Sequence, residues 1–217
     1  MNNPIFQLLV LAGIAIFLIL RLKSVLGTRD GFEQPPLSRA GEQPRKAKFE
    51  VIEGGPDHDI LAHAEENSDS YRALAAMKKL EPSFNVTEFL TGARGAYEMI
   101  LMGFEHGNLA EIKPFLEDDV YESFAAVVEA RNEQGLTIEA DFIGIREMAL
   151  DDALLADDNT AEITVRFVGE LTSVVRDNAG EIVEGEPGKV KRQKDLWTFA
   201  RVMGSDDPNW QLVATGE

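Results

Sequence analysis

The residues best suited to binding chemistry lie on one strand-like segment, DLWTFAR, at residues 195–201. Side chains alternate between the two faces of a strand, so one face here carries Asp195, Trp197, Phe199 and Arg201. A concave sheet often encloses an apolar pocket. We therefore predict a possible pocket for a lipid tail or peptide segment, lined by Tyr97, Leu101, Phe167, Trp197 and Phe199. The alternative is that these aromatic side chains are core and that Asp195 and Arg201 pair across the sheet surface.

Catalysis requires a nucleophile or a poised acid–base pair beside a group that stabilises developing charge. The chain has no cysteine, which excludes disulfides, thiolate catalysis and cysteine zinc sites. An enzyme of this kind of fold would be expected to hold an isolated buried Asp–His or Asp–Tyr pair, and none can be read from the sequence. We predict that the protein is not an enzyme and uses no cofactor.

A metal site is also not predicted. The three histidines are poorly spaced for one: His58, His63 and His106. The acid pairs Asp151–Asp152 and Asp157–Asp158 lack the loop that gathers six or more oxygens around calcium. They are expected to be surface acids near a turn.

Charge is unevenly distributed along the 217 residues, which carry a net charge of −17. Residues 1–20 have no charged side chain, residues 21–48 have a net charge of +4, and residues 49–217 have a net charge of −21. Phosphate backbones would repel so acidic a region, so nucleic acid is not an expected partner.

Residues 1–23 are predicted to be a transmembrane anchor, because about 20 apolar residues span a bilayer as a helix. The alternative is a cleaved signal peptide, which would begin with basic residues and end with small ones. The sequence begins with MNNP and the apolar run ends in ILRLK. The membrane-facing residues would be Ile5, Phe6, Leu8, Leu9, Val10, Leu11, Ile14, Ile16, Phe17, Leu18, Ile19 and Leu20.

Basic residues follow the apolar run and none precedes it: Arg21, Lys23 and Arg29. By the positive-inside rule, the C-terminal side of the span lies in the cytoplasm and the N-terminus lies outside. The same three residues either contact anionic lipid or only set the orientation.

Residues 24–69 are rich in proline, glycine and charge and are predicted to be a flexible tether. Residues 70–217 form the predicted domain, which begins with a short helix over 70–80. The longest predicted helix spans 85–107, where Asn85 and Glu88 suit a capping box and Gly107 suits a stop. Its apolar face carries Phe89, Ala93, Ala96, Tyr97, Ile100, Leu101 and Phe104.

Two further helices are predicted before the strands begin. Asn108 and Glu111 suggest a capping box for the first, and the second spans about 118–134. The apolar face of the second carries Val120, Phe124, Val127 and Val128.

Strands follow the helices. Residues 160–176 alternate between apolar and polar side chains, and the rougher pattern of 136–156 predicts a bulged strand. Residues 178–188 are expected to form turns, before two last strands over 189–202 and 210–215. Helices first and antiparallel strands afterwards indicate an α+β domain with the helices on one face of the sheet.

Four segments together resemble a known family: FLTGARGAYEMIL (89–101), VYESF (120–124), DLWTFAR (195–201) and DPNWQL (207–212). They are similar to the C-terminal domain of the mitochondrial inner-membrane import-motor scaffold, and more closely to its bacterial relatives called TimA. The resemblance covers about residues 70–215, and VLGTRDG (25–31) also resembles the bacterial forms.

The resemblance implies a fold like that of nuclear transport factor two, with helices backing a curved antiparallel sheet. It also implies a tethering role, because the mitochondrial relative holds a DnaK-type chaperone at the translocase and touches cardiolipin. The resemblance does not extend to the long charged N-terminal region of that relative. We expect an adaptor of the bacterial inner membrane that binds translocase or chaperone partners, and the alternative is a lipid- or small-ligand-binding module.

Overall fold

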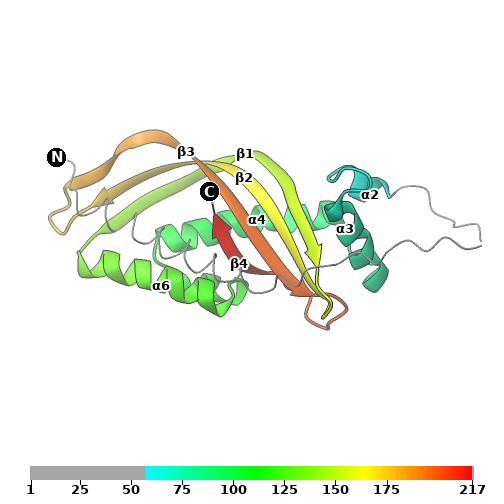
Figure 1. Cartoon of the computed structure of the whole chain (residues 1–217). Coiled ribbons are helices and arrows are strands. Elements are labelled where there is room, and N and C mark those ends of the chain that lie inside the picture. Colours follow the sequence, from blue (N-terminus) through cyan, green and yellow to red (C-terminus); the bar gives the residue numbers. More distant parts are fainter. Residues whose placement is uncertain (1–56, 217) are drawn as a thin grey trace, which may run out of the picture. The chain divides into compact units, whose positions relative to one another are not determined.

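The computed structural model describes residues 57–216, which lie within the second of two compact units, residues 54–217. Helices come first and strands second along this part of the chain (Figure 1). The predicted α+β class is confirmed. The predicted membrane span and its flanking basic residues lie outside the described residues.

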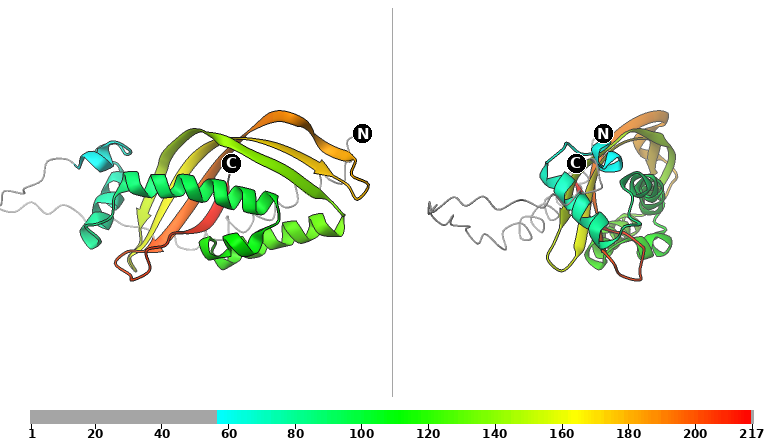
Figure 2. Two further views of the ribbon diagram at one scale, coloured as in Figure 1. Left: turned by 180° about the vertical axis from the view of Figure 1, so that it is seen from behind. Right: turned by 90° about the vertical axis from the view of Figure 1, so that its right-hand side faces the viewer.

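Four antiparallel strands form one sheet in the order β1-β2-β3-β4. Their bounds are β1 Thr137–Leu155, β2 Thr160–Arg176, β3 Ile182–Val202 and β4 Gln211–Gly216. The pairing of β1 with β2 shifts register three times, which confirms the predicted bulges and bends the strand. The sheet arches over α4 (Val86–Glu105), as the end-on view in Figure 2 shows.

The α4 helix has the ends that the sequence predicts. The side chain of Asn85 accepts a hydrogen bond of 2.8 Å from the Glu88 N–H, and Gly107 follows the helix with a φ of +74°. The apolar face packs beneath the sheet and buries Val86, Phe89, Leu90, Ala93, Tyr97, Ile100 and Leu101. This helix is therefore the element around which the core is built.

The segment before α4 is more ordered than the sequence predicts. The predicted tether extends to residue 69, but residues 57–69 contain α2 (His58–Leu61) and the start of α3 (Asp69–Leu80). Ile60 is 1% exposed and belongs to the core. One apolar side chain, Ile60, and the capping carboxylates of Asp57 and Asp59 hold this segment on the domain. These are too few residues to give the periodic pattern from which a helix is predicted.

The helices after α4 are α5 (Leu109–Ile112), the 3₁₀ turn η1 (Lys113–Phe115) and α6 (Asp118–Glu133). Asn108 is the N-cap residue of α5, as predicted, but the predicted capping box is wrong, because the Asn108 side chain makes no capping hydrogen bond. The predicted apolar face of α6 is buried only at Val120, and Val127 is 38% exposed. The reason is that α6 lies at the border of the helix layer (Figure 2), where one side of the helix faces solvent.

The prediction of turns over 178–188 is wrong for its second half, because β3 already begins at Ile182. The chain bulges between Gly185, opposite Val174, and Val190, opposite Thr172. Gly185 has a φ of +84°, which a glycine adopts at little cost. The glycines that suggest a turn locally thus serve a bulge within a strand that β2 holds in place.

Candidate functional site

The five residues predicted to line a pocket come together beneath the sheet and pack on one another. Tyr97 stacks on Phe167 with ring centroids 4.4 Å apart and meets Trp197 at 4.7 Å. Their exposed fractions are 0% for Tyr97 and Phe167, 2% for Phe199 and 4% for Leu101 and Trp197. These side chains fill the space between α4 and the sheet.

A hydrogen-bonded polar pair lies inside this aromatic cluster. The Tyr97 hydroxyl donates to a carboxylate oxygen of Asp195 at 2.5 Å, and Gln193 donates to the other oxygen at 3.0 Å. Asp195 is 8% exposed, and it faces inward because β3 pairs it with Phe167 of β2. Burial raises the pKa of Tyr97 far above its ordinary range, and the hydrogen bond to Asp195 raises it further.

This Asp–Tyr pair was missed in the sequence. The available signal was the alternation of β3, which places Asp195 on the same face as Trp197 and Phe199. What the sequence did not show is that Tyr97, 98 residues earlier, is the residue it meets. Neither of two hollows on the described surface, which lie at the end of α4 and beside β3, is lined by the pair.

The alternative interpretation paired Arg201 with Asp195, but Arg201 pairs with another residue. Its guanidinium donates to Glu81 at 2.9 Å and lies 5.2 Å from the ring centre of Trp210. Glu81 follows α3 and also accepts the Gly204 N–H, and the hydrogen bond from Arg201 lowers the pKa of Glu81. This contact therefore joins the end of α3 to the loop between β3 and β4.

A second polar cluster fixes the beginning of the described chain. Asp59 accepts the N–H groups of Val86 at 2.8 Å and Thr87 at 3.0 Å, so it caps α4 from outside the helix. Lys78 contacts Asp57 at 2.9 Å and Asp59 at 2.7 Å. Burial opposes ionisation of Asp59, but the bonds from Lys78 and the two N–H groups hold its pKa far below the usual range.

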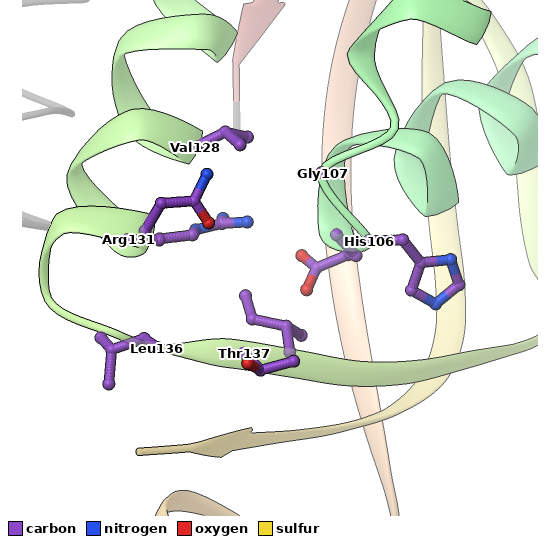
Figure 3. A pocket seen from close by; sticks show the side chains of 9 residues that line it. His106, Gly107, Val128, Arg131, Leu136 and Thr137 are labelled. Atoms are coloured by element: carbon purple, nitrogen blue, oxygen red, sulfur yellow. The ribbon is translucent and has the colours of Figure 1, made fainter. Parts of the chain in front are cut away.

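A small hollow of about 90 Å³ lies where α4 and α6 end (Figure 3). Arg131 of α6 lies on one side of it and His106 on the other. His106 is engaged, since its Nε2 atom lies 2.8 Å from the Ala140 carbonyl oxygen. Arg131 donates to the Phe104 carbonyl at 3.3 Å and stacks over the Phe104 ring, and burial lowers its pKa. These groups tie the two helices to the first strand.

Among residues 57–216, no group of three or more potential ligands is placed to hold a metal ion. Of the acid pairs, Asp152 accepts a hydrogen bond from Ser70 at 2.8 Å, and Asp158 accepts the Thr160 N–H in the turn between β1 and β2. Asp152 thus joins α3 to β1, and Asp158 stabilises the turn. The same part of the chain contains no helix long and apolar enough to cross a bilayer.

The fold and its filled aromatic core define a class of protein: an α+β domain whose antiparallel sheet curves around one long helix. Comparison with known families narrows the class, because residues 70–217 match the Tim44-like domain. The chain belongs to this family, and the predicted resemblance is confirmed at the level of the domain.

Three curated relatives are the TIM44 subunits of the mitochondrial import inner membrane translocase from Homo sapiens, Rattus norvegicus and Mus musculus. The human protein is 23% identical over 158 residues, which is 71% of this chain and 35% of the relative. The rat and mouse proteins are 22% and 21% identical over the same length. The match thus spans about a third of the length of these relatives.

Two solved structures are more distantly similar. The intermembrane space region of the chloroplast protein ARC6 covers 66% of this chain and 94% of its own, with a TM-score of 0.36 and 10% identity. A ketosteroid isomerase-like protein from Erwinia carotovora atroseptica covers 61% and 95%, with a TM-score of 0.32 and 14% identity. Nothing about the site is inferred from either.

Proposed function

We propose that this chain is a membrane-tethered adaptor that holds a protein partner near a bilayer during protein translocation. One observation carries the proposal: the Tim44-like domain accounts for residues 70–217, which is nearly all of the described fold. The relatives that share this domain are subunits of an inner-membrane translocase. The proposed partners are accordingly translocase or chaperone proteins.

The location that we propose is the bacterial inner membrane, with the N-terminus outside and the domain in the cytoplasm. The support is the uncharged run over residues 1–20 and the net charge of +4 over residues 21–48. We infer further that the domain is of the nuclear transport factor two type, because its sheet curls around a helix.

An enzyme of this kind of fold was expected to hold a buried Asp–Tyr pair, and Tyr97–Asp195 is such a pair. We nevertheless propose a binding role rather than an enzymatic one, because neither of the two described hollows is lined by this pair. The four aromatic residues and Leu101 that were predicted to line a ligand pocket belong to one packed core, and none of the five is more than 4% exposed. A lipid or small ligand would have to displace packed side chains to enter, so we favour the adaptor over the ligand-binding alternative.

Capture of partners tests the adaptor function. The full-length protein, crosslinked in cells and purified in detergent, is compared with a variant that lacks residues 1–23. We expect translocation or chaperone proteins to be enriched with the full-length chain, because the span restricts the domain to the membrane. If the two lists agree, or if neither exceeds an untagged control, the proposal is wrong.

Orientation is testable because the chain has no cysteine of its own. Ala126 is exposed on α6, so Ala126→Cys gives a label site on the domain. Asn3→Cys gives one ahead of Ile5, the first residue predicted to face the membrane. A membrane-impermeant maleimide should label Asn3→Cys in spheroplasts and Ala126→Cys only after lysis. The reverse pattern would contradict the proposed topology.

A further inference from the structure

The edge of β3 is only partly covered in the described chain. β4 pairs with β3 from Leu196, opposite Gly216, to Ala200, opposite Gln211. The preceding residues, Val190–Lys194, pair with β2 on one side and with no described strand on the other. Figure 1 shows β3 continuing past the end of β4.

The open edge begins after the bulge that contains Pro187, where proline has no N–H to offer a neighbouring strand. The register with β2 runs without a shift from Val190 to Lys194. The open segment is thus regular and about 17 Å long, enough for one short added strand.

The charge of this edge differs from that of the rest of the domain. Residues 49–217 contain 14 basic and 35 acidic side chains, and four of the basic ones lie within six residues: Lys189, Lys191, Arg192 and Lys194. Lys189 pairs with Glu186 and Arg192 with Glu170. Lys191 and Lys194 are exposed, and no ion pair is formed by either among residues 57–216.

An apolar surface accompanies these cations. Val190 is 52% exposed at this edge, and it also lines a hollow of about 340 Å³ beside the bulge, together with Val175, Lys191, Glu184 and Glu186. The edge therefore offers backbone hydrogen bonds, positive charge and an apolar contact.

We propose that the Val190–Lys194 edge receives an extended acidic segment of a partner protein, which adds to the sheet as a strand beside β3. Pairing of backbone groups supplies affinity, and the lysines select acidic side chains. Lysines on a sheet edge also prevent pairing between copies of the same protein. An added acidic segment distinguishes the two roles, because only the binding role predicts that the segment pairs with β3.

Binding of defined peptides to the full-length protein in detergent tests this proposal, which rests on the adaptor function. Lys191 and Lys194 lie on opposite faces of β3, because side chains alternate along a strand. The probe is a capped peptide of about eight residues in which pairs of glutamates alternate with pairs of valines, so that glutamates lie on both faces of the added strand. One control has lysine in place of each glutamate, and a second is the acidic peptide with methylated backbone nitrogens. We expect only the unmodified acidic peptide to bind and to slow amide exchange over 190–194, with affinity that falls as salt rises.

Variants separate the edge from general electrostatics. Lys191→Glu with Lys194→Glu should weaken binding of the acidic peptide by about tenfold or more, because like charges repel. Arg72→Glu with Lys79→Glu changes the net charge equally but on exposed positions of α3, and should leave binding nearly unchanged. Equal weakening by both double variants would overturn the proposal, as would equal binding of the methylated peptide.

The guarding role has its own signature. If Lys191→Ser with Lys194→Ser makes the protein self-associate while the acidic peptide protects no amide in the parent, the lysines only guard the edge and the proposal is wrong. Partner capture in cells distinguishes this failure from failure of the adaptor function. If a partner is recovered equally with the parent and with the double glutamate variant, the adaptor function stands and the proposed binding at the β3 edge is wrong.

Discussion

At the scale of single residues, the buried hydrogen bond between Tyr97 and Asp195 makes the stability of the core sensitive to substitution at either position. Tyr97 is 0% exposed and its hydroxyl hydrogen bonds to a carboxylate that is itself buried. A buried polar group that loses its partner costs its full desolvation energy. The pair is therefore a point where small chemical changes have measurable effects.

Replacement of Tyr97 by phenylalanine tests this pair. Tyr97→Phe keeps the ring that stacks on Phe167 but removes the donor to Asp195, so we expect a loss of about 1–3 kcal/mol in the free energy of unfolding. Chemical denaturation measures the change. Tyr121→Phe, at a half-buried position of α6, is the matched control and should alter stability little.

The pH dependence of stability gives a second test of the same residue. The pKa of Tyr97 is raised by burial and by Asp195, so the folded state favours the protonated phenol. Its contribution is complete below the ordinary tyrosine pKa of about 10 and is lost as the pH rises above that value. Denaturation midpoints between neutral and alkaline pH should fall more steeply for the parent than for Tyr97→Phe. Parallel curves would show that Tyr97 is free to ionise.

At the scale of elements, two segments adopt structures that their local sequence does not predict, and a few contacts hold each of them in place. α2 is fastened to α4 by Asp59 and to α3 by Lys78. The β2–β3 ribbon is continued through a bulge by glycine. In each case the contacts join residues far apart in the sequence.

Removal of the Asp59 side chain should loosen α2. Asp59→Ala leaves the first N–H groups of α4 and the Lys78 ammonium without this acceptor, and we expect a loss of about 1–2 kcal/mol. Asp59→Asn keeps an acceptor and separates hydrogen bonding from charge. Asp69→Asn, which alters only an exposed pair with Arg72, is the control.

Acid should reproduce part of this effect. The pKa of Asp59 is lowered, so its stabilisation is present above the ordinary value of about 4 and is lost as the pH falls below it. Amide exchange at Val86 and Thr87, followed from neutral to acidic pH, reports on the contact. Protection that is the same in the parent and in Asp59→Ala would contradict the capping role.

Gly185 tests the bulge in β3. A methyl group at Gly185 would lie 2.4 Å from the Ser173 carbonyl oxygen, in addition to the strain of a φ of +84°. Gly180 has a φ of +81° but open space around it. Gly185→Ala should therefore destabilise the ribbon more than Gly180→Ala, as measured by amide exchange over Val174–Arg176. Equal effects would mean that backbone strain alone matters.

At the scale of the whole molecule, the proposed function depends on a domain kept near a membrane by a separate segment. The chain divides into two compact units, and the second contains the whole described fold. The acidic character of residues 49–217 disfavours binding to anionic lipid surfaces. Membrane attachment is accordingly expected to come from the first unit.

Deletion of residues 1–23 should release the protein from membranes without altering its fold. Fractionation of cells should find the shortened chain in the supernatant, and its thermal unfolding should match that of the full-length protein in detergent. A shortened chain that still sediments with membranes would show that the folded domain has a lipid affinity of its own.

Sequence alone determined those elements that are specified by their own side chains. The alternation of β2 predicted its bounds, Thr160–Arg176, and the cap at Asn85 predicted where α4 begins, because each signal lies within the element itself. The same kind of alternation placed Trp197 and Phe199 on one face of β3, and both side chains are buried.

Only the tertiary structure decided which distant residues these faces bring together. It paired Tyr97 with Asp195 and Arg201 with Glu81, and it turned Ile182 and its neighbours into a strand by laying them against β2. It also joined Asp59 to α4 across 27 residues. Hydrogen bonds between segments far apart in the chain follow from how the elements pack, and the local pattern of side chains within one element does not determine that packing.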